Sequence, residues 1–322
     1  MTLAIALGSM SLTRRSWVRN AVVVVLVILV LILLWVFAPN FFKLNNLINI
    51  LVQASILAVM AMGMAVVMIG GGIDLSLPFN AAVSAVLGAM YMRASGDAVG
   101  GAAIMLVAAA AIGLLNGIAV GYLRMIPFVV TLAMMSITAG SAVWLTNSVS
   151  ISNIPEGFIG LFRQRPLGLP FAVWVSLTVS MAATILMGMS VFARHLYGVG
   201  INVKAAAIAR IQVRRVLAAS YLVAGIAAGI AAIMLTGRLA SASANLASPS
   251  AVLDVVSACV IGGISIYGGS GKVWGAALGA LFVTLLNNAL NAAEISLYVN
   301  QMIRGGIIIA FIAFDRLTTA RG

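Results

Sequence analysis

Long apolar stretches separated by short polar segments run through most of this chain. Their lengths are near the roughly 20 residues with which an α-helix crosses a bilayer. They fall at about 21–38, 48–69, 78–92, 100–122, 126–146, 170–193, 216–236, 251–266, 273–291 and 298–314. The pattern predicts an all-α membrane protein with about ten transmembrane helices, two of which, at 78–92 and 251–266, are short.

Glycine clusters stand at the ends of two of these predicted helices. Gly70, Gly71 and Gly72 follow the second apolar stretch, and Gly262 and Gly263 stand near the end of the eighth. Glycine weakens a helix, and a broken helix at membrane depth is tolerated where it lines a cavity or is buried in protein. We therefore expect broken helices at both places, and we assign Gly71, Gly72, Gly262 and Gly263 to a solute path.

An isolated carboxylate, Asp74, comes two residues after the first glycine cluster, in a chain with 6 acidic residues among 322. A charged side chain at membrane depth is costly, which marks it as a functional candidate. Its carboxylate either accepts hydrogen bonds from solute hydroxyls or caps the helix that begins near Leu77, and both roles are open. Ser76 is expected to cap the same helix, and Asp254 to cap the eighth. Asn116 is expected to hydrogen-bond between helices or to solute, so Asp74, Ser76 and Asn116 join the glycines on the solute path.

Two short matches within the chain predict an internal two-fold repeat. Val67–Ile73 resembles Val260–Ser265, and Leu114–Gly117 resembles Leu285–Asn288. Repeats whose helices are interrupted by glycine at matching positions point to the central site of a transporter. The repeat therefore supports the assignment of both glycine clusters to one path.

The segment 194–215 is the most basic connection between predicted helices. It holds Arg194, His195, Lys204, Arg210, Arg214 and Arg215. Asn202 is placed to cap a short helix whose Ala205, Ile208 and Ile211 share one face, with basic side chains on the rest. A small amphipathic helix of this kind suits docking into a groove on a partner protein.

The composition excludes a soluble domain and several classes of function. Hydrophobic residues make up 63% of the chain and charged residues 7%, with a mean hydropathy of +1.19, whereas a soluble domain carries roughly a quarter charged residues. The net charge of +12 is scattered along the chain, without the basic helix or aromatic platform that nucleic acid needs, so no nucleic-acid partner is expected. The single cysteine, Cys259, supplies neither a disulfide nor a thiolate metal site. No nucleophile, base and orienting group occur together, so we expect no enzyme activity.

The distribution of basic residues predicts the orientation in the membrane. With a cytoplasmic N-terminus, 12 of the 18 Lys and Arg residues lie on the inside and 6 on the outside, as the positive-inside tendency requires. Both termini are then cytoplasmic. The expected organisation is a cytoplasmic segment at 1–20, one transmembrane domain at 21–316 with an inner loop at about 194–215, and a cytoplasmic tail at 317–322.

Four sequence blocks carry a family resemblance. In order along the chain they are Gly71–Ser76, Asn116-Gly117 with Ile126–Leu132, Tyr197–Asn202 with Ala205-Ala206, and Leu253–Ala258 with Ile261–Gly263 and Gly268–Gly271. With the spans around them they cover residues 41–316, and the chain resembles the inner-membrane permease of bacterial ABC importers for monosaccharides, the ribose, xylose, arabinose and galactose group. Two departures are Leu77-Pro78, where the family usually has Val-Gly, and Ala139-Gly140, where it commonly has a basic residue.

The resemblance implies a permease for a monosaccharide, a pentose or a hexose, in the bacterial inner membrane. Such a permease pairs with a second copy or a sister subunit, docks ATPase subunits on its cytoplasmic side and receives sugar from a periplasmic binding protein. The family's coupling segment maps onto Gly200, Asn202, Ala205 and Ala206, with Arg210 beside it. The chain itself is expected to hold no cofactor, because ATP and Mg belong to the partner subunits. Its Gly269–Lys272 segment fails as a phosphate loop, since Val273 stands where Ser or Thr is required.

One alternative function stays open. A secondary sugar carrier could couple solute to protons through Asp74 or Asp254. A proton carrier would bury more acidic residues along a relay and would have little need for a basic inner helix. The permease is therefore the favoured hypothesis.

Overall fold

The computed structural model describes residues 39–310 apart from 294, 297, 304, 307 and 308. The predicted span at 21–38, the terminal segments at 1–20 and 317–322, and the end of the span at 298–314 lie outside the described residues. Within the described part the elements are helices, and the single β-bridge joins Ile151 to Ala242. The prediction of an all-α fold is confirmed for this part of the chain.

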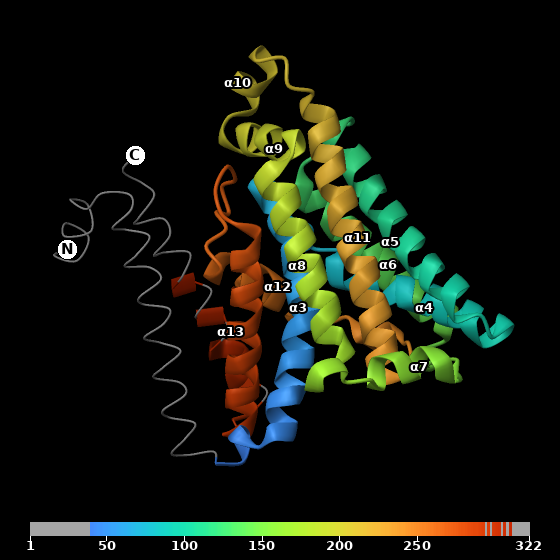
Figure 1. Ribbon diagram of the computed structural model, residues 1–322. Helices are drawn as coiled ribbons and strands as arrows, with labels where there is room; N and C mark the ends of the chain where they lie inside the picture. Colours follow the sequence, from blue (N-terminus) through green and yellow to red (C-terminus); the bar gives the residue numbers. More distant parts are fainter. Residues whose placement is uncertain (1–38, 294, 297, 304, 307–308, 311–322) are drawn as a thin grey trace. The chain divides into compact units, whose positions relative to one another are not determined.

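The helices follow the apolar stretches closely (Figure 1). In chain order they are η1 (Pro39–Phe42), α3 (Leu44–Ile69), α4 (Leu77–Ser95), α5 (Ala98–Gly121), α6 (Pro127–Thr146), α7 (Glu156–Arg163), η2 (Pro166–Gly168), α8 (Phe171–Met189), α9 (Val191–Ile201), α10 (Val203–Ile208), α11 (Val213–Leu239), η3 (Ala244–Leu246), α12 (Pro249–Ile261) and α13 (Val273–Ala292). Seven segments among the described residues are long and apolar enough to cross a membrane: α3, α5, α6, α8, α11, the segment 244–261 that contains α12, and α13. The protein is therefore a multi-pass membrane protein.

The chain divides into two compact units. Of the described residues, one unit holds those at 39–50 and from 282 onward, and the other holds residues 51–281. In the first unit Phe41, Ile50 and Ala289 are buried together, and Leu47 and Leu285 pack against them. Every residue assigned to the solute path or to the coupling segment belongs to the second unit.

Helix α4 is largely enclosed within the second unit. It packs against α5, α6 and α11, and its buried residues point in all directions around its axis. A helix that is apolar all round belongs in the interior of a bundle. It corresponds to the short stretch predicted at 78–92, and its central position places its N-terminus, next to Asp74, inside the bundle.

Small residues bring α5 and α11 into backbone contact. Gly113, Gly117 and Gly121 repeat every fourth residue along α5, and a Cβ atom on Gly117 would lie 2.6 Å from the carbonyl oxygen of Ala218 in α11. Close approach of this type is the usual basis of helix association in membranes, where the lipid removes the hydrophobic driving force between helices. The α5–α11 pair is the main packing contact of the second unit.

The predicted span at 170–193 ends earlier than expected. Its helix, α8, stops at Met189, because the side chain of Ser190 accepts a hydrogen bond from the backbone N–H of Ala193 (3.0 Å) and caps a new helix, α9. Residues 194–201, which the sequence placed in a loop, are therefore helical. Figure 1 shows α9 and α10 at one end of α11, and α7 at the other end.

Candidate functional site

Helix α3 ends at the first glycine cluster in a Schellman motif. Gly71 has φ +83°, and the N–H groups of Gly71 and Gly72 donate to the carbonyl oxygens of Met68 (2.9 Å) and Val67 (3.1 Å). These two bonds satisfy carbonyl groups that the end of a helix leaves unpaired. Glycine tolerates the left-handed backbone at no steric cost, which explains why the helix stops here. The chain then runs as an irregular segment to the start of α4.

Helix α12 ends at the second glycine cluster in the same geometry. Gly263 has φ +81°. The N–H of Gly263 donates to the carbonyl oxygen of Val260 (3.0 Å), and the N–H of Ile264 donates to that of Cys259 (2.9 Å). Gly71 and Gly263 therefore hold equivalent positions in the two breaks.

Three predicted path residues form one buried polar cluster behind the first break. Asp74, Ser76 and Asn116 are each fully buried. Oδ1 of Asp74 accepts hydrogen bonds from the N–H of Ser76 (3.0 Å), the hydroxyl of Ser76 (2.6 Å) and Nδ2 of Asn116 (3.4 Å), and the same Nδ2 donates to Oγ of Ser76 (2.9 Å). Within the described residues, Oδ2 of Asp74 and Oδ1 of Asn116 have no hydrogen-bond partner. The cluster thus has two acceptors available for a donor.

The prediction that Ser76 caps α4 through its side chain is wrong. Ser76 occupies the N-cap position, but its side chain makes no capping bond and donates to Asp74 instead. Asp74 fixes the turn before α4 by accepting the N–H of Ser76. The carboxylate therefore has a structural role in the first break.

The prediction that Asp254 caps the eighth span is also wrong. Helix α12 begins at Pro249, five residues before Asp254, and its cap is Ser248, which accepts a hydrogen bond from the N–H of Ala251 (3.2 Å). A serine followed by a proline at the first helical position is a strong helix start. Asp254 lies in the second turn of the helix and cannot cap it.

Two side chains that the sequence did not single out also hold the segment before α4. The hydroxyl of Thr131, in α6, donates to the carbonyl oxygen of Ile73 (3.2 Å), and the hydroxyl of Tyr221, in α11, donates to the same oxygen (3.4 Å). Thr131 lies in one of the four family blocks, which was a usable signal. Tyr221 was detectable only as a polar aromatic side chain within an apolar stretch.

The 194–215 segment contains a short helix capped by Asn202, as predicted, but α10 ends at Ile208, so Ile211 does not share its face. Oδ1 of Asn202 accepts a hydrogen bond from the N–H of Ala205 (3.0 Å) and caps α10. Ala206 is buried, whereas Ala205 and Arg210 are exposed. Ile208 exposes 85% of its surface. The helix therefore presents an uncovered apolar side chain beside basic ones.

The 194–215 segment touches the first helix break through glycine. The N–H of Gly269 donates to the carbonyl oxygen of Ile69 (2.8 Å). A Cβ atom on Gly200 would overlap that same oxygen, and one on Gly268 would lie 2.8 Å from Cα of Gly71. We call this meeting of Ile69–Gly71, Gly200 and Gly268-Gly269 the glycine junction.

A tyrosine ties the loop after α12 to α9. The hydroxyl of Tyr197 donates to the carbonyl oxygen of Gly271 at 2.7 Å. Burial raises the pKa of the Tyr197 phenol, so that it stays protonated and remains a donor. The loop after α12 is thus fastened both to the end of α3, through Gly269, and to α9.

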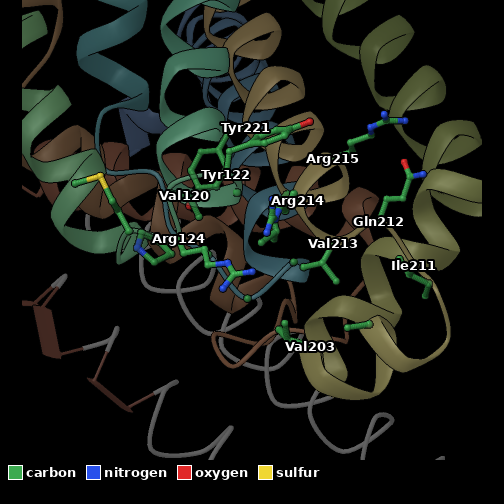
Figure 2. Close-up of a pocket in the computed structure, with 18 residues that line it drawn as sticks. Val120, Tyr122, Arg124, Val203, Ile211, Gln212, Val213, Arg214, Arg215 and Tyr221 are labelled. Atoms are coloured by element: carbon green, nitrogen blue, oxygen red, sulfur yellow. The ribbon is translucent and has the colours of Figure 1, made fainter.

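A cavity of about 830 Å³ lies between the first break and the 194–215 segment (Figure 2). Its lining includes Gly70–Gly72, Val203 and Ala207 of α10, and three arginines, Arg124, Arg214 and Arg215. Asp74, Ser76 and Asn116 do not line it. The polar cluster is therefore closed off from this cavity.

The fold and the site together define a multi-pass membrane protein with broken helices around a buried polar cluster, an architecture typical of transport proteins. Residues 46–312 match the family described as branched-chain amino acid transport system / permease component, and the chain belongs to this family.

Three relatives of the chain carry the names of sugar permeases. The chain is 32% identical over 308 residues to the ribose import permease protein RbsC of Escherichia coli K12, covering 94% of this chain and 95% of the relative. It is 29% identical over 286 residues to the D-allose transport system permease protein AlsC of the same organism, covering 87% and 86%. It is 30% identical over 325 residues to the galactose/methyl galactoside import permease protein MglC of Salmonella typhimurium, covering 95% and 96%. These matches confirm the family resemblance, and no solved structure matches the chain significantly.

Proposed function

We propose that the protein is the permease subunit of an ABC importer in the bacterial inner membrane. It translocates a monosaccharide, a pentose or a hexose, that a periplasmic binding protein delivers and that ATP hydrolysis on partner ATPase subunits drives. The observation that carries this proposal is the glycine junction, which joins the 194–215 segment to the helix break beside a buried polar cluster. The names of the relatives support the class of substrate.

The polar cluster is the proposed narrow point of the solute path. Sugars carry many hydroxyl donors, and the unpartnered acceptors on Asp74 and Asn116 suit such donors. Gly71, Gly72, Gly262 and Gly263 would let the backbone of both breaks rearrange. Because the cluster is fully buried, solute passage requires that the first break move.

The segment around α10 is the proposed docking site for the ATPase subunits. Gly200, Asn202, Ala205, Ala206 and Arg210 belong to it, and the cap on Asn202 holds its short helix in shape. ATP and Mg would be bound by the partners, and the chain would act without catalysis of its own. A second copy or a sister subunit would complete the membrane part.

The ten-span count, the internal repeat, the single-domain organisation and the cytoplasmic termini remain predictions. The Schellman geometry shared by the two breaks supports the repeat. The spacing differs, however, because Asn116 lies in the second helix after the first break and Asn287 in the first helix after the second. The match is therefore closest at the breaks themselves.

Reconstitution tests the function against the alternative of a proton-coupled carrier. In proteoliposomes that contain the chain, its ATPase subunits and its binding protein, we expect a monosaccharide to accumulate only when ATP is supplied. The measurement is uptake of radiolabelled ribose, allose and galactose with ATP, or with a pH gradient alone. Accumulation by the chain alone on a pH gradient would favour the carrier and reject the permease.

The exposed apolar residue of α10 gives a prediction about docking. Replacing Ile208 with aspartate should weaken capture of the ATPase subunits at least tenfold, because a charge would have to be buried at the contact. Leu167, in η2 at a distance from α10 along the chain, is similarly exposed at 89% and provides the matched control, Leu167→Asp. Pull-down of the ATPase subunits from detergent measures both variants. Equal capture by Ile208→Asp and wild type would place the docking site elsewhere.

A further inference from the structure

A second, apolar hollow adjoins the cavity beside the 194–215 segment. It has a volume of about 540 Å³ and lies between α5 and α11, lined by Leu114, Ile118, Tyr122, Arg215, Ala218, Ala219 and Leu222. Tyr122 and Arg215 line both hollows. Together the two form one depression, with a basic part and an apolar part.

The basic part has the chemistry of an anion site. Among the described residues, Arg124, Arg214 and Arg215 line the larger cavity and no acidic side chain does. Within the same part of the chain, none of the three forms an ion pair, since the one ion pair there joins Arg163 to Glu156. Figure 2 shows Arg124 and Arg214 extending into the middle of the view. Two guanidinium groups that extend into one cavity, with Arg215 also in its lining and no carboxylate partner, favour a phosphate, which arginine binds through paired N–H donors.

The apolar part faces the surface that the bilayer would cover. Both of its helices are among the segments long and apolar enough to cross a membrane. Leu114 and Ile118 are each 39% exposed, so the groove is open along the lipid-facing side of α5. A soluble phosphate would have no use for such a groove, whereas an acyl chain would fill it.

We propose that the depression binds an anionic phospholipid, with the phosphate at Arg124 and Arg214, beside Arg215, and an acyl chain in the surface groove along the α5–α11 contact. The positive-inside count predicts that these arginines lie at the cytoplasmic surface, where basic pockets between helices bind the headgroups of anionic lipids. A second copy of the chain is a poor occupant of the basic part, since the whole sequence offers 6 acidic residues against 18 basic ones. The bound lipid would link α10, the start of α11 and the start of α6.

Native mass spectrometry of delipidated protein tests the proposal. We expect phosphatidylglycerol to bind at least tenfold more tightly than phosphatidylcholine with the same chains, and inorganic phosphate not to bind at the same concentrations. The variant Arg124→Gln/Arg214→Gln/Arg215→Gln should lose roughly 100-fold in affinity for phosphatidylglycerol, from the usual contribution of each basic residue near a membrane surface. The matched control Arg93→Gln/Arg163→Gln/Arg165→Gln removes the same charge elsewhere and should bind within twofold of wild type.

A variant in the apolar groove distinguishes a bound lipid from a bound free anion. It also provides a test that stands even if the triple arginine variant fails to fold. Ala219→Phe should fill the apolar hollow and weaken phosphatidylglycerol binding about tenfold while the arginines remain. Equal binding of both phospholipids, wild-type affinity in the arginine variant, or saturation by inorganic phosphate would each overturn the proposal. If the arginine variant loses ATPase capture but binds lipid as the wild type does, the proposal is also overturned, because a protein partner would then occupy the cavity.

Discussion

Replacing Gly200 with alanine is expected to reduce sugar uptake tenfold or more while leaving the protein in the membrane. The added Cβ atom would overlap the carbonyl oxygen of Ile69 and would lie 2.5 Å from the backbone nitrogen of Gly269. Backbone atoms cannot move aside as a flexible side chain can, so the junction must separate. Overpacking of this kind costs about 1–3 kcal/mol, which corresponds to roughly a 5- to 150-fold shift in an equilibrium.

The matched control lies two residues earlier in the same helix. A Cβ atom on Gly198 would lie 3.6 Å from Cδ1 of Ile211, an ordinary contact. Gly198→Ala should therefore transport within twofold of wild type, and the loss of glycine should make it slightly more stable. Uptake and ATP hydrolysis are measured together in proteoliposomes. Gly200→Ala should still hydrolyse ATP, and normal uptake by this variant would show that the junction carries no coupling.

Replacing Asp74 with alanine is expected to abolish uptake. The change removes the acceptor for the N–H and the hydroxyl of Ser76, which stay buried, whereas Nδ2 of Asn116 keeps its bond to Oγ of Ser76. Each buried polar group left without a partner costs about 1–3 kcal/mol. The segment before α4 would lose the turn that positions it, and the proposed solute path would lose its carboxylate.

The comparison with an exposed aspartate separates this effect from a general loss of capping. Asp97 caps α5 by accepting a hydrogen bond from the N–H of Val99 (2.9 Å) at the surface. Asp97→Ala should cost about 1 kcal/mol of stability and leave uptake intact. Thermal unfolding in detergent and uptake in cells are measured for both variants. Normal uptake by Asp74→Ala would show that Asp74 is essential neither to the structure nor to the proposed solute path.

Local rules accounted for the helix ends that were predicted well. The glycine clusters stop α3 and α12 because a left-handed residue is needed at each end, and glycine supplies it without a Cβ clash. Asn202 caps α10 through its own side chain, three residues from its partner. These predictions succeeded because each depends on a few neighbouring residues.

The failures came from competing local signals. Ser190 starts a helix within a stretch of high hydropathy, so hydropathy alone missed the end of α8. Ser248 and Pro249 start α12 ahead of Asp254, and the serine took the capping role that was expected of the aspartate. The hydroxyl of Ser76 donates to Asp74 and does not cap the helix, because a carboxylate is a strong hydrogen-bond acceptor.

Composition and short-range pattern predicted the membrane class, the apolar helices and the breaks at glycine, whereas the family followed from the resemblance of four sequence blocks. Only the tertiary structure shows that Asn116 contacts Asp74, 42 residues away, and that Gly200 lies against Ile69 and Gly269. Packing of α4 against α5, and of α9 against the loop after α12, decided those contacts. No periodicity encodes them, since they depend on which helix faces meet once the bundle has formed.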